Sequence, residues 1–541
     1  MLEGTTKAVR EYVETVFRRG REPMEPIGFT PNFADQPSRH KIYPGVSRFP
    51  LPAGTDGTLG PAKRALLGPP ADAGDPLWTM ESLAALLRLS YGVLDRRLRI
   101  TWNQDSDVRV TYPGALWGRA TASGGGMYPL EIYWVAGRGG PLSPGVYHYS
   151  TAHHAFERLL TGDLTDEVRA ACGNGGEVDD SDGFLLVSVR FWKNSFKYNS
   201  FCYHVVTQDA GALLGCWELI ARGLGRRLER VLWFDDERLN RLIGTDTYEE
   251  SMLAVVPLPF TRTGGTVTAP GPAPAPGHGT LIDRPSFERS AVTLTFEQVE
   301  EVHRAVLEDR RPRPDRTTAR DLVPLPRPGS AGTPLPAPLE ERLGRDLGGV
   351  LRSRRTSFGS FVGSRPLGLD ELATVLAGAA SARHYASDVT PTRTGLTGLY
   401  VLAHRVAGLP SGTYRYDPDG HRLQTVQERP LADFLQRNYY LSNYNLDQVG
   451  AVLAISARWE SVLRAYGSRG YRVVNAEVGA VAQNAYVAAG ATGVGCGAVL
   501  GFDNISIDEA VGLDGTDERT FLFVLLGHER ADRADFDYRL V

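Results

Sequence analysis

The second half of this chain repeats the first half at a constant offset, and this repeat constrains the fold more than any other feature. Matched residues lie 268 positions apart (466 − 198 = 268), in the pairs Tyr198 and Tyr466, Gly211 and Gly479, Phe234 and Phe502, Asp235 and Asp503, Gly244 and Gly512, and Glu250 and Glu518. A register without gaps over this span indicates two copies of one domain. Two copies of a domain on one chain correspond to a dimer of that domain. A binding site at the interface would therefore occur twice, and one of the two sites could lose its function.

The repeat divides the 541 residues into four parts. We expect an N-terminal extension over residues 1–75, copy one over 76–260, a linker rich in proline and glycine with one helix over 261–343, and copy two over 344–541. Strand-like and helical segments alternate irregularly in each copy, with hairpin-like pairs, which favours an α+β fold with a mostly antiparallel sheet. The extension and the linker could dock a partner, act as lids, or serve as spacers.

Composition excludes several classes of protein. The content of 42% apolar and 23% charged residues is ordinary for a globular protein, and a net charge of −4 gives no general attraction to nucleic acid or to an anionic membrane. No apolar run is long enough to cross a bilayer, and the first residues lack the apolar segment of a signal peptide, so we expect a cytoplasmic protein. The four cysteines have no CxxC spacing, so we expect neither a disulfide framework nor a metal site.

A glycine-rich segment, SGGGMYPLE, precedes a predicted strand in copy one. Its first four residues are Ser123, Gly124, Gly125 and Gly126. Glycines at such a position allow the backbone to approach a flat or anionic ligand closely. The alternative interpretation is a tight turn with no ligand.

A lysine beside a tyrosine, Lys197-Tyr198, places two groups that can transfer protons next to each other. Burial would lower the pKa of the lysine toward a useful range. The alternative is a surface lysine beside a core aromatic residue. Copy two has Ala465-Tyr466 at the matching positions, so the fold does not require the lysine.

Two segments of copy two suggest a binding site for a phosphate group. The basic segment RSRRTSFGSF begins at Arg352, and Arg352, Arg354, Arg355 and Ser357 offer cationic and hydroxyl donors, with Arg530 as a weaker candidate near the C-terminus. A solvated basic helix end is the alternative. The later segment GVGCGAVLGFDN has Gly497 and Gly501 where copy one has Glu229 and Trp233. Backbone that is open in copy two is therefore filled in copy one, unless the two loops have simply diverged.

These motifs, in this order, resemble the nitroreductase superfamily. The shared pattern is RRS-x-R-x-F, then SGG-x-x-YPLE, then KY, then a helix with (D/E)-x-G, then GFDD…GLDG…E, and it covers roughly 76–260 and 344–541. More narrowly, SGGGMYPLE and Lys197-Tyr198 resemble the SagB/McbC-type azoline dehydrogenases of thiazole/oxazole-modified peptide biosynthesis, in the tandem form of thiopeptide clusters. The resemblance implies two nitroreductase-like domains that form an intrachain pseudo-dimer.

In that superfamily FMN binds between two protomers, which implies one composite site here. Copy two would supply the phosphate clamp and the open glycines, namely Arg354, Arg355, Ser357, Gly497 and Gly501. Copy one would supply Ser123, Gly124, Gly125 and Gly126 with Lys197 and Tyr198. Phe358 stands where the family has a second clamp arginine, so Arg352 or Arg530 is expected to compensate. The reciprocal site, with Trp233 and Ala465 and no clamp, is expected to be inactive.

The resemblance implies oxidation of thiazolines or oxazolines to azoles in a ribosomally made precursor peptide. Lys197 or Tyr198 would take the Cα proton, FMN would accept the hydride, and oxygen would reoxidise the flavin. The implied partners are the azoline-containing precursor peptide and a cyclodehydratase. Two other functions remain open from the sequence. One is an NAD(P)H-dependent nitroreductase or flavin reductase, and the other is a flavin-free scaffold of a peptide-modification complex.

Overall fold

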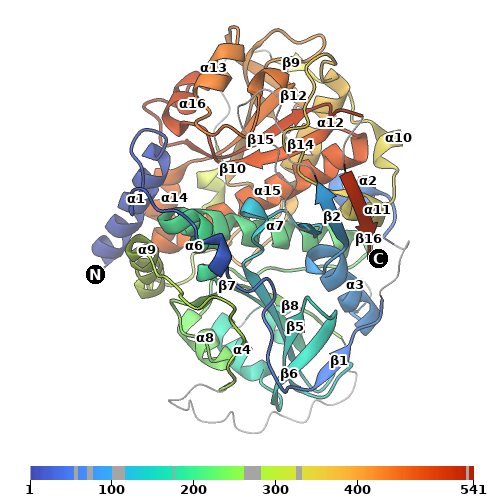
Figure 1. Ribbon diagram of the computed structural model, residues 1–541, viewed down its shortest axis with the longest axis vertical. Coiled ribbons are helices and arrows are strands. Elements are labelled where there is room, and N and C mark those ends of the chain that lie inside the picture. The colour runs from blue at the N-terminus through green and yellow to red at the C-terminus, as the bar shows by residue number, and fades with distance from the viewer. Residues whose placement is uncertain are drawn as a thin grey trace.

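Two β-sheets lie on either side of a pair of long helices. The computed structural model describes residues 2–53, 59–69, 77–99, 116–173, 175, 177–260, 282–324, 332–531 and 535–540. Figure 1 shows one sheet in each half of the molecule, with α7 (Cys202–Gly223) and α15 (Gly470–Thr492) crossing between them. Every residue of α7 is buried, as expected for a helix that is packed on all sides in the centre of a large protein.

The first sheet belongs to copy one and its strand pairs are all antiparallel. In spatial order its strands are β1 (Arg48–Pro50), β6 (Ala155–Thr161), β5 (Gly145–Ser150), β4 (Leu130–Ala136), β7 (Gly183–Arg190) and β8 (Glu250–Pro257). Every residue of β4 and β8 is buried, because segments of chain cover both faces of the sheet at these strands.

The second sheet repeats this order in copy two and adds one strand. In spatial order its strands are β14 (Gly495–Val499), β15 (Arg519–Gly527), β13 (Ala451–Ala457), β10 (Thr397–Ala403), β11 (Gly412–Asp417), β12 (Arg422–Glu428) and β9 (Thr333–Pro334). A third, small sheet joins the copies, because β16 (Asp535–Arg539) pairs with β2 (Asp95–Arg99), which pairs with β3 (Leu116–Gly118).

Shorter helices surround the sheets. Those before and within copy one are α1 (Leu2–Arg18), α2 (Ala62–Leu67), α3 (Met80–Tyr91), α4 (Thr165–Cys172), α5 (Glu177–Asp180), α6 (Phe191–Tyr198) and α8 (Asp236–Ile243). Those that follow are α9 (Glu297–Glu308), α10 (Glu340–Leu343), α11 (Leu347–Ser353), α12 (Leu369–Ala380), α13 (Ala432–Arg437), α14 (Trp459–Tyr466) and α16 (Asn504–Ala510). None of the helices in the described ranges is long and apolar enough to cross a membrane.

Helix boundaries follow local capping signals. Helix α12 spans Leu369–Ala380 and begins with the amide of Gly368 donating to the Glu371 carboxylate. Thr79 caps α3 by accepting from the Ser82 amide. Near the start of copy two, α10 and α11 are separate helices with a break at Gly344.

The internal repeat is also a repeat in space. A Cβ atom on Gly211 would collide with the backbone of Ala476, and one on Gly479 would collide with the backbone of Gln208. The matched glycines therefore let α7 and α15 cross in close contact, each against the other. This arrangement confirms the predicted α+β fold of two domains paired within one chain.

Further matched pairs make matched contacts. Ser188 donates to Glu250 at 2.7 Å in copy one, and Ser456 donates to Glu518 at 2.6 Å in copy two, next to a β-bulge in each strand. The starts of α2 and α11 also pair reciprocally, because the Ala62 amide donates to the Arg345 carbonyl and the Leu347 amide donates to the Gly60 carbonyl. The two copies are thus related by an approximate twofold axis.

The extension and the described part of the linker pack against the two copies. Helix α1 lies along α9, as Figure 1 shows, and the Phe17 ring contacts the Phe521 ring edge-on at 5.3 Å. Ile282, at the start of the described linker, is buried in the core of copy one. Helix α9 matches the one helix predicted for the linker. These segments therefore add core contacts to both copies.

Candidate active site

A cavity of about 860 Å³ lies between the two copies. Copy one lines it with the glycine segment and the end of α6, and copy two lines it with the residues after α11, with loop 439–444 and with the residues after β14. Residues of the N-terminal extension between Pro23 and Arg39 complete the wall. The volume is within the range of small-molecule sites in proteins.

A buried carboxylate on α7 holds the glycine segment in place. Asp209 accepts hydrogen bonds from the Ser123 hydroxyl at 2.6 Å and from the Gly124 amide at 2.8 Å. Burial raises the pKa of Asp209 to about 7, although these two hydrogen bonds act in the opposite direction. Gly125 and Gly126 have positive φ angles of 61° and 68°, which favour glycine. The segment is therefore a fixed, exposed turn of backbone at the cavity wall.

Lys197 and Tyr198 converge on this turn from the end of α6. A Cβ atom on Gly125 would lie 2.7 Å from Nζ of Lys197 and would also overlap the Tyr198 hydroxyl. Burial lowers the pKa of Lys197. Burial and the charge of Asp209 raise the pKa of Tyr198 well above its usual value. The environment therefore shifts Lys197 toward its neutral amine and Tyr198 toward its protonated hydroxyl.

Arg354, Arg355, Thr356 and Phe358 of copy two line the opposite part of the cavity. Arg354 is buried, its guanidinium lies 5.0 Å from the centre of the Tyr486 ring, and its Nη2 donates to the Arg119 carbonyl at 3.0 Å. The structure thus brings the two predicted halves of the site, from different copies, to one cavity.

Comparison with known proteins identifies the family. Residues 351–528 match the model of the nitroreductase family. A protein of Methanocaldococcus jannaschii described as a nitroreductase is 33% identical over 149 residues, which are 27% of this chain and 75% of that protein. The chain belongs to the nitroreductase family. This confirms the predicted superfamily, whose members are oxidoreductases that typically bind FMN.

Solved structures of nitroreductase type extend the likeness to both copies. A crystal structure described as a nitroreductase from Anabaena variabilis covers 97% of this chain and 99% of its own, with 22% identity and a TM-score of 0.70. That likeness shows the fold alone. A chain of the E. coli microcin synthetase complex, solved with a truncated pro-peptide bound, aligns with 38% of this chain and 78% of its own at 17% identity. Its TM-score of 0.28 is too low to support an argument about function.

Other residues predicted for this nitroreductase site lie behind the cavity wall. The Ser357 hydroxyl is buried and accepts from the Cys496 amide at 2.8 Å, so it fixes the position of the clamp segment. Gly497 and Gly501 do not line the cavity themselves, but they make room for loop 439–444. A Cβ atom on Gly497 would lie 2.8 Å from the Tyr444 hydroxyl. Arg352 and Arg530 are also outside the lining residues.

The reciprocal position between the two copies is filled by protein. Trp233 is buried there, and its amide and that of Leu232 donate to Asp388 at 3.1 and 2.8 Å. Arg313 of the linker lies 3.7 Å from the same carboxylate. In addition, the residues that follow α2 are Gly68 and Pro69, whereas those that follow its counterpart α11 are Arg354 and Arg355.

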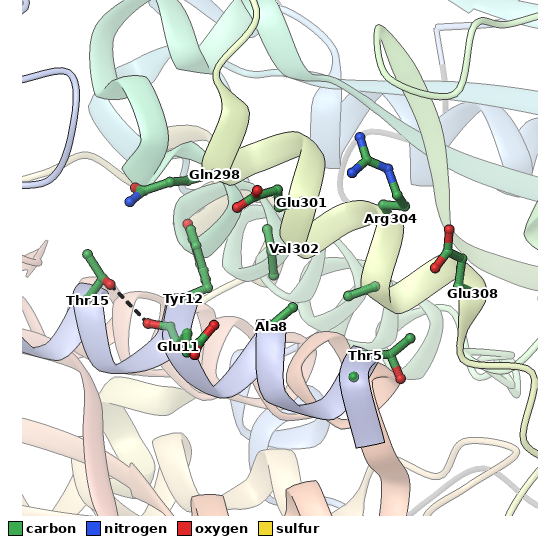
Figure 2. Close-up of a pocket in the computed structure, with 12 residues that line it drawn as sticks. Thr5, Ala8, Glu11, Tyr12, Thr15, Gln298, Glu301, Val302, Arg304 and Glu308 are labelled. Carbon is green, nitrogen blue, oxygen red and sulfur yellow. Dashed lines mark hydrogen bonds between the residues drawn. The ribbon is translucent and has the colours of Figure 1, made fainter. Parts of the chain in front are cut away.

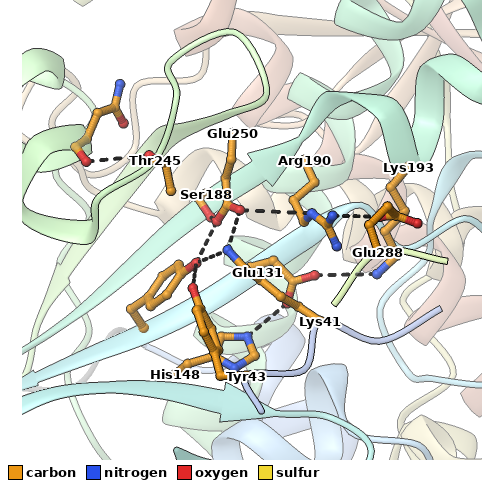
Figure 3. A network of polar contacts seen from close by, with 12 residues as sticks. Lys41, Tyr43, Glu131, His148, Ser188, Arg190, Lys193, Thr245, Glu250 and Glu288 are labelled. Atoms are coloured by element: carbon orange, nitrogen blue, oxygen red, sulfur yellow. Dashed lines mark hydrogen bonds and ion pairs between the residues drawn. The ribbon is translucent and has the colours of Figure 1, made fainter. Parts of the chain in front are cut away.

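Sequence reasoning missed two cavity residues, Arg119 and Lys193. Lys193 lies one helical turn before Lys197 and therefore on the same face of α6. Its pKa is lowered to about 8 by burial, although the Glu131 carboxylate 3.5 Å away favours the ammonium. Figure 3 shows this pair at the edge of a buried polar network that continues through His148. Arg119 stands four residues before Ser123 and Lys193 four before Lys197, but neither residue belongs to a motif that the sequence alone reveals.

A second hollow lies on the surface between α1 and α9 (Figure 2). Its volume is about 480 Å³, and its charged residues are Glu11, Glu301, Glu308 and Arg304. None of the residues predicted for the flavin site lines it. The cavity between the copies is therefore the candidate active site.

Proposed function

We propose that this nitroreductase-family chain is an FMN-dependent azoline dehydrogenase with one composite site per chain. Its substrate would be a thiazoline or oxazoline ring in a ribosomally made peptide, and its product the aromatic azole. The observation that carries the proposal is the convergence of Lys197 and Tyr198 on the Gly125 turn, in a cavity completed by Arg354 of the other copy.

The residues present fit FMN. Arg354 has two buried guanidinium nitrogens, Nε and Nη1, without a hydrogen-bond partner among the described residues, and an anion such as a phosphate would satisfy them. The Gly124–Gly126 turn presents backbone without side chains to the cavity, which suits a flat ring system. When bound, FMN would supply the acceptor for the hydride that leaves the substrate.

Lys197 would serve as the base for the substrate proton. Conversion of an azoline to an azole removes two hydrogens, one as the Cα proton and one as a hydride from Cβ. The neutral amine of Lys197 would accept the proton and become an ammonium group, while the Tyr198 hydroxyl would stay protonated and could donate a hydrogen bond to the substrate. Burial of the amine favours this role, because it destabilises the ammonium form, which cannot accept a proton.

The remaining cavity wall suits a peptide-borne heterocycle. Apolar and aromatic residues of the extension and of both copies line it, including Phe29, Trp117, Met127 and Leu441. Such walls bind flat rings through their faces. We further propose that the azoline peptide comes from a cyclodehydratase partner, since an azoline must first be formed by loss of water from a peptide.

The test is a comparison of variants of the purified full chain with a synthetic thiazoline peptide. Lys197→Ala should abolish the loss of two hydrogens, measured by mass spectrometry, and should leave the flavin absorbance unchanged. Arg354→Ala combined with Arg355→Ala should instead lose the flavin. Lys63→Ala is the matched control, because Lys63 lies on α2 and pairs with Glu340 outside the cavity. Unchanged turnover by Lys197→Ala would exclude the proposed base.

A second candidate is an NAD(P)H-dependent nitroreductase, which the description of the relatives favours. Rapid bleaching of the bound flavin by NADPH, with no oxidation of azoline peptides, would select this candidate. Slow or absent bleaching together with azole formation would select the azoline dehydrogenase.

A further inference from the structure

We propose that Arg119 of copy one and Arg354 of copy two form one anion clamp, which takes a phosphate monoester. The inference rests on the proposed function, in which that phosphate belongs to FMN. It differs from the clamp expected from the sequence, which came from copy two alone. Arg119 would supply the second clamp arginine that Phe358 replaces.

The two arginines are neighbours in the cavity wall. Nη2 of Arg354 donates to the carbonyl of Arg119 at 3.0 Å, and both residues line the cavity. Their exposed fractions are 3% for Arg119 and 8% for Arg354. The Arg354 guanidinium thus contacts the backbone of Arg119, and the two arginines, one from each copy, lie in the same wall of the cavity, largely away from solvent.

Two nitrogens of each guanidinium group lack a hydrogen-bond partner among the described residues. Nε and Nη1 of Arg119, and Nε and Nη1 of Arg354, are buried without a partner among the described residues. Aromatic faces surround them instead: Arg119 lies 4.4 Å from the Tyr91 ring centre and 4.7 Å from that of Tyr128, and Arg354 lies over Tyr486. Ring faces attract a cation but do not satisfy these N–H groups. Buried charges without a partner are costly, so this arrangement points to a bound anion.

The charged residues that line the described part of the cavity also favour an anionic ligand. Its basic residues are Arg19, Arg39, Arg97, Arg119, Lys193, Lys197, Arg354 and Arg355. Asp209 is the one carboxylate among the described lining residues, and it is already occupied by Ser123 and Gly124. A phosphate monoester has three terminal oxygens, so two planar guanidinium forks can both donate to it.

Copy two also fixes the backbone that carries Arg119. The Gln483 side chain on α15 donates to the Ala120 carbonyl at 3.1 Å and accepts from the Ala122 amide at 2.9 Å. The Thr121 amide donates to the Ser90 carbonyl. The clamp is therefore preorganised by contacts between the copies, and little order remains to be gained when the anion binds.

The experiment compares FMN with riboflavin, which lacks the phosphate, by fluorescence titration of the apo form of the full chain. Wild type should prefer FMN. Arg119→Gln should raise the Kd for FMN by about 10- to 100-fold, the loss expected for charge-assisted hydrogen bonds, and leave the Kd for riboflavin unchanged. Arg119→Lys should retain part of the preference. Arg138→Gln, at an exposed turn, is the control with no expected effect.

Equal weakening of FMN and riboflavin by Arg119→Gln, or no weakening of FMN, would overturn the clamp. If Arg119→Gln fails to fold by circular dichroism, Arg119→Lys and Arg354→Lys decide the same comparison. If wild type binds neither flavin, the proposed function fails. Thermal stabilisation by inorganic phosphate then tests the clamp separately, since it should occur in wild type and be smaller in Arg119→Lys.

Discussion

Nζ of Lys193 lies 3.5 Å from Oε1 of Glu131, and both side chains are almost wholly buried beside the active-site cavity. The other carboxylate oxygen of Glu131 lies 3.1 Å from Nε2 of His148. Burial opposes the ionisation of Glu131, but Lys193 and His148 outweigh it and hold its pKa well below the usual range. Glu131 is the last residue of the glycine-rich motif, and its carboxylate is the common partner of the buried Lys193 and His148 side chains (Figure 3).

Glu131→Gln should therefore destabilise the protein by about 3–5 kcal/mol, because it leaves buried cationic groups without their counter-charge. The free energy of unfolding in urea measures this. It should also lower the pKa of Lys193 further, since the attraction that favours its ammonium form is lost. Glu249→Gln, at an exposed neighbour of β8, is the control. A loss below about 1 kcal/mol, the level of a surface ion pair, would contradict the assignment.

The pH dependence of azoline oxidation should follow Lys197. The amine must be neutral to accept a proton, so kcat/KM should rise with pH, and the midpoint of the rise should lie below the usual lysine pKa because burial lowers the pKa of Lys197. Tyr198→Phe should keep this rise, because the raised pKa of Tyr198 leaves its hydroxyl protonated over the same interval. Loss of the alkaline rise in Tyr198→Phe would assign the base to Tyr198 instead.

One FMN should be released per chain. The cavity between the copies would hold it, whereas the reciprocal position contains buried Trp233 and the linker residue Arg313. Denaturation of the purified protein and quantification of the flavin by absorbance would measure the ratio. Two FMN per chain would show that the second position is open after all.

Gly211→Ala should destabilise the protein by about 1–3 kcal/mol, the usual cost of overpacking. Its Cβ atom would meet the backbone of Ala476, and a helix backbone cannot move aside as a side chain can. Gly490→Ala on α15 is the matched control, because its Cβ atom would make an ordinary contact with Val350. That variant should be neutral or stabilising by up to about 1 kcal/mol, since alanine is the better helix former. Thermal denaturation compares the two.

The repeat, the α+β class and the gathering of the glycine turn with Lys197 could be predicted because each leaves a local pattern in the sequence. The roles of Arg119 and Lys193 could not. Arg119 is a single basic residue beside a short strand, and its importance arises from Arg354, which lies 235 positions away. A lone residue carries no periodicity or motif that would reveal such a long-range neighbour.

The linker also shows how far its structure can be predicted from the sequence alone. Proline and glycine content predicted a linker and left open whether it docks a partner, acts as a lid or serves as a spacer, and the described residues 282–324 pack against both copies. Arg316 pairs with Glu229, the residue that stands in place of Gly497. Composition describes the flexibility of a segment alone, whereas burial depends on the surface that the rest of the chain offers to it.

Strand β16 pairs with β2, and β2 pairs with β3, which leads directly into Arg119. A wall of the cavity in copy one therefore depends on a strand near the end of copy two, which the ribosome makes long after copy one. During synthesis, copy one can form its own sheet long before this third sheet closes. A nascent or truncated chain would consequently hold an incomplete pocket, and activity should appear only once the whole polypeptide has emerged.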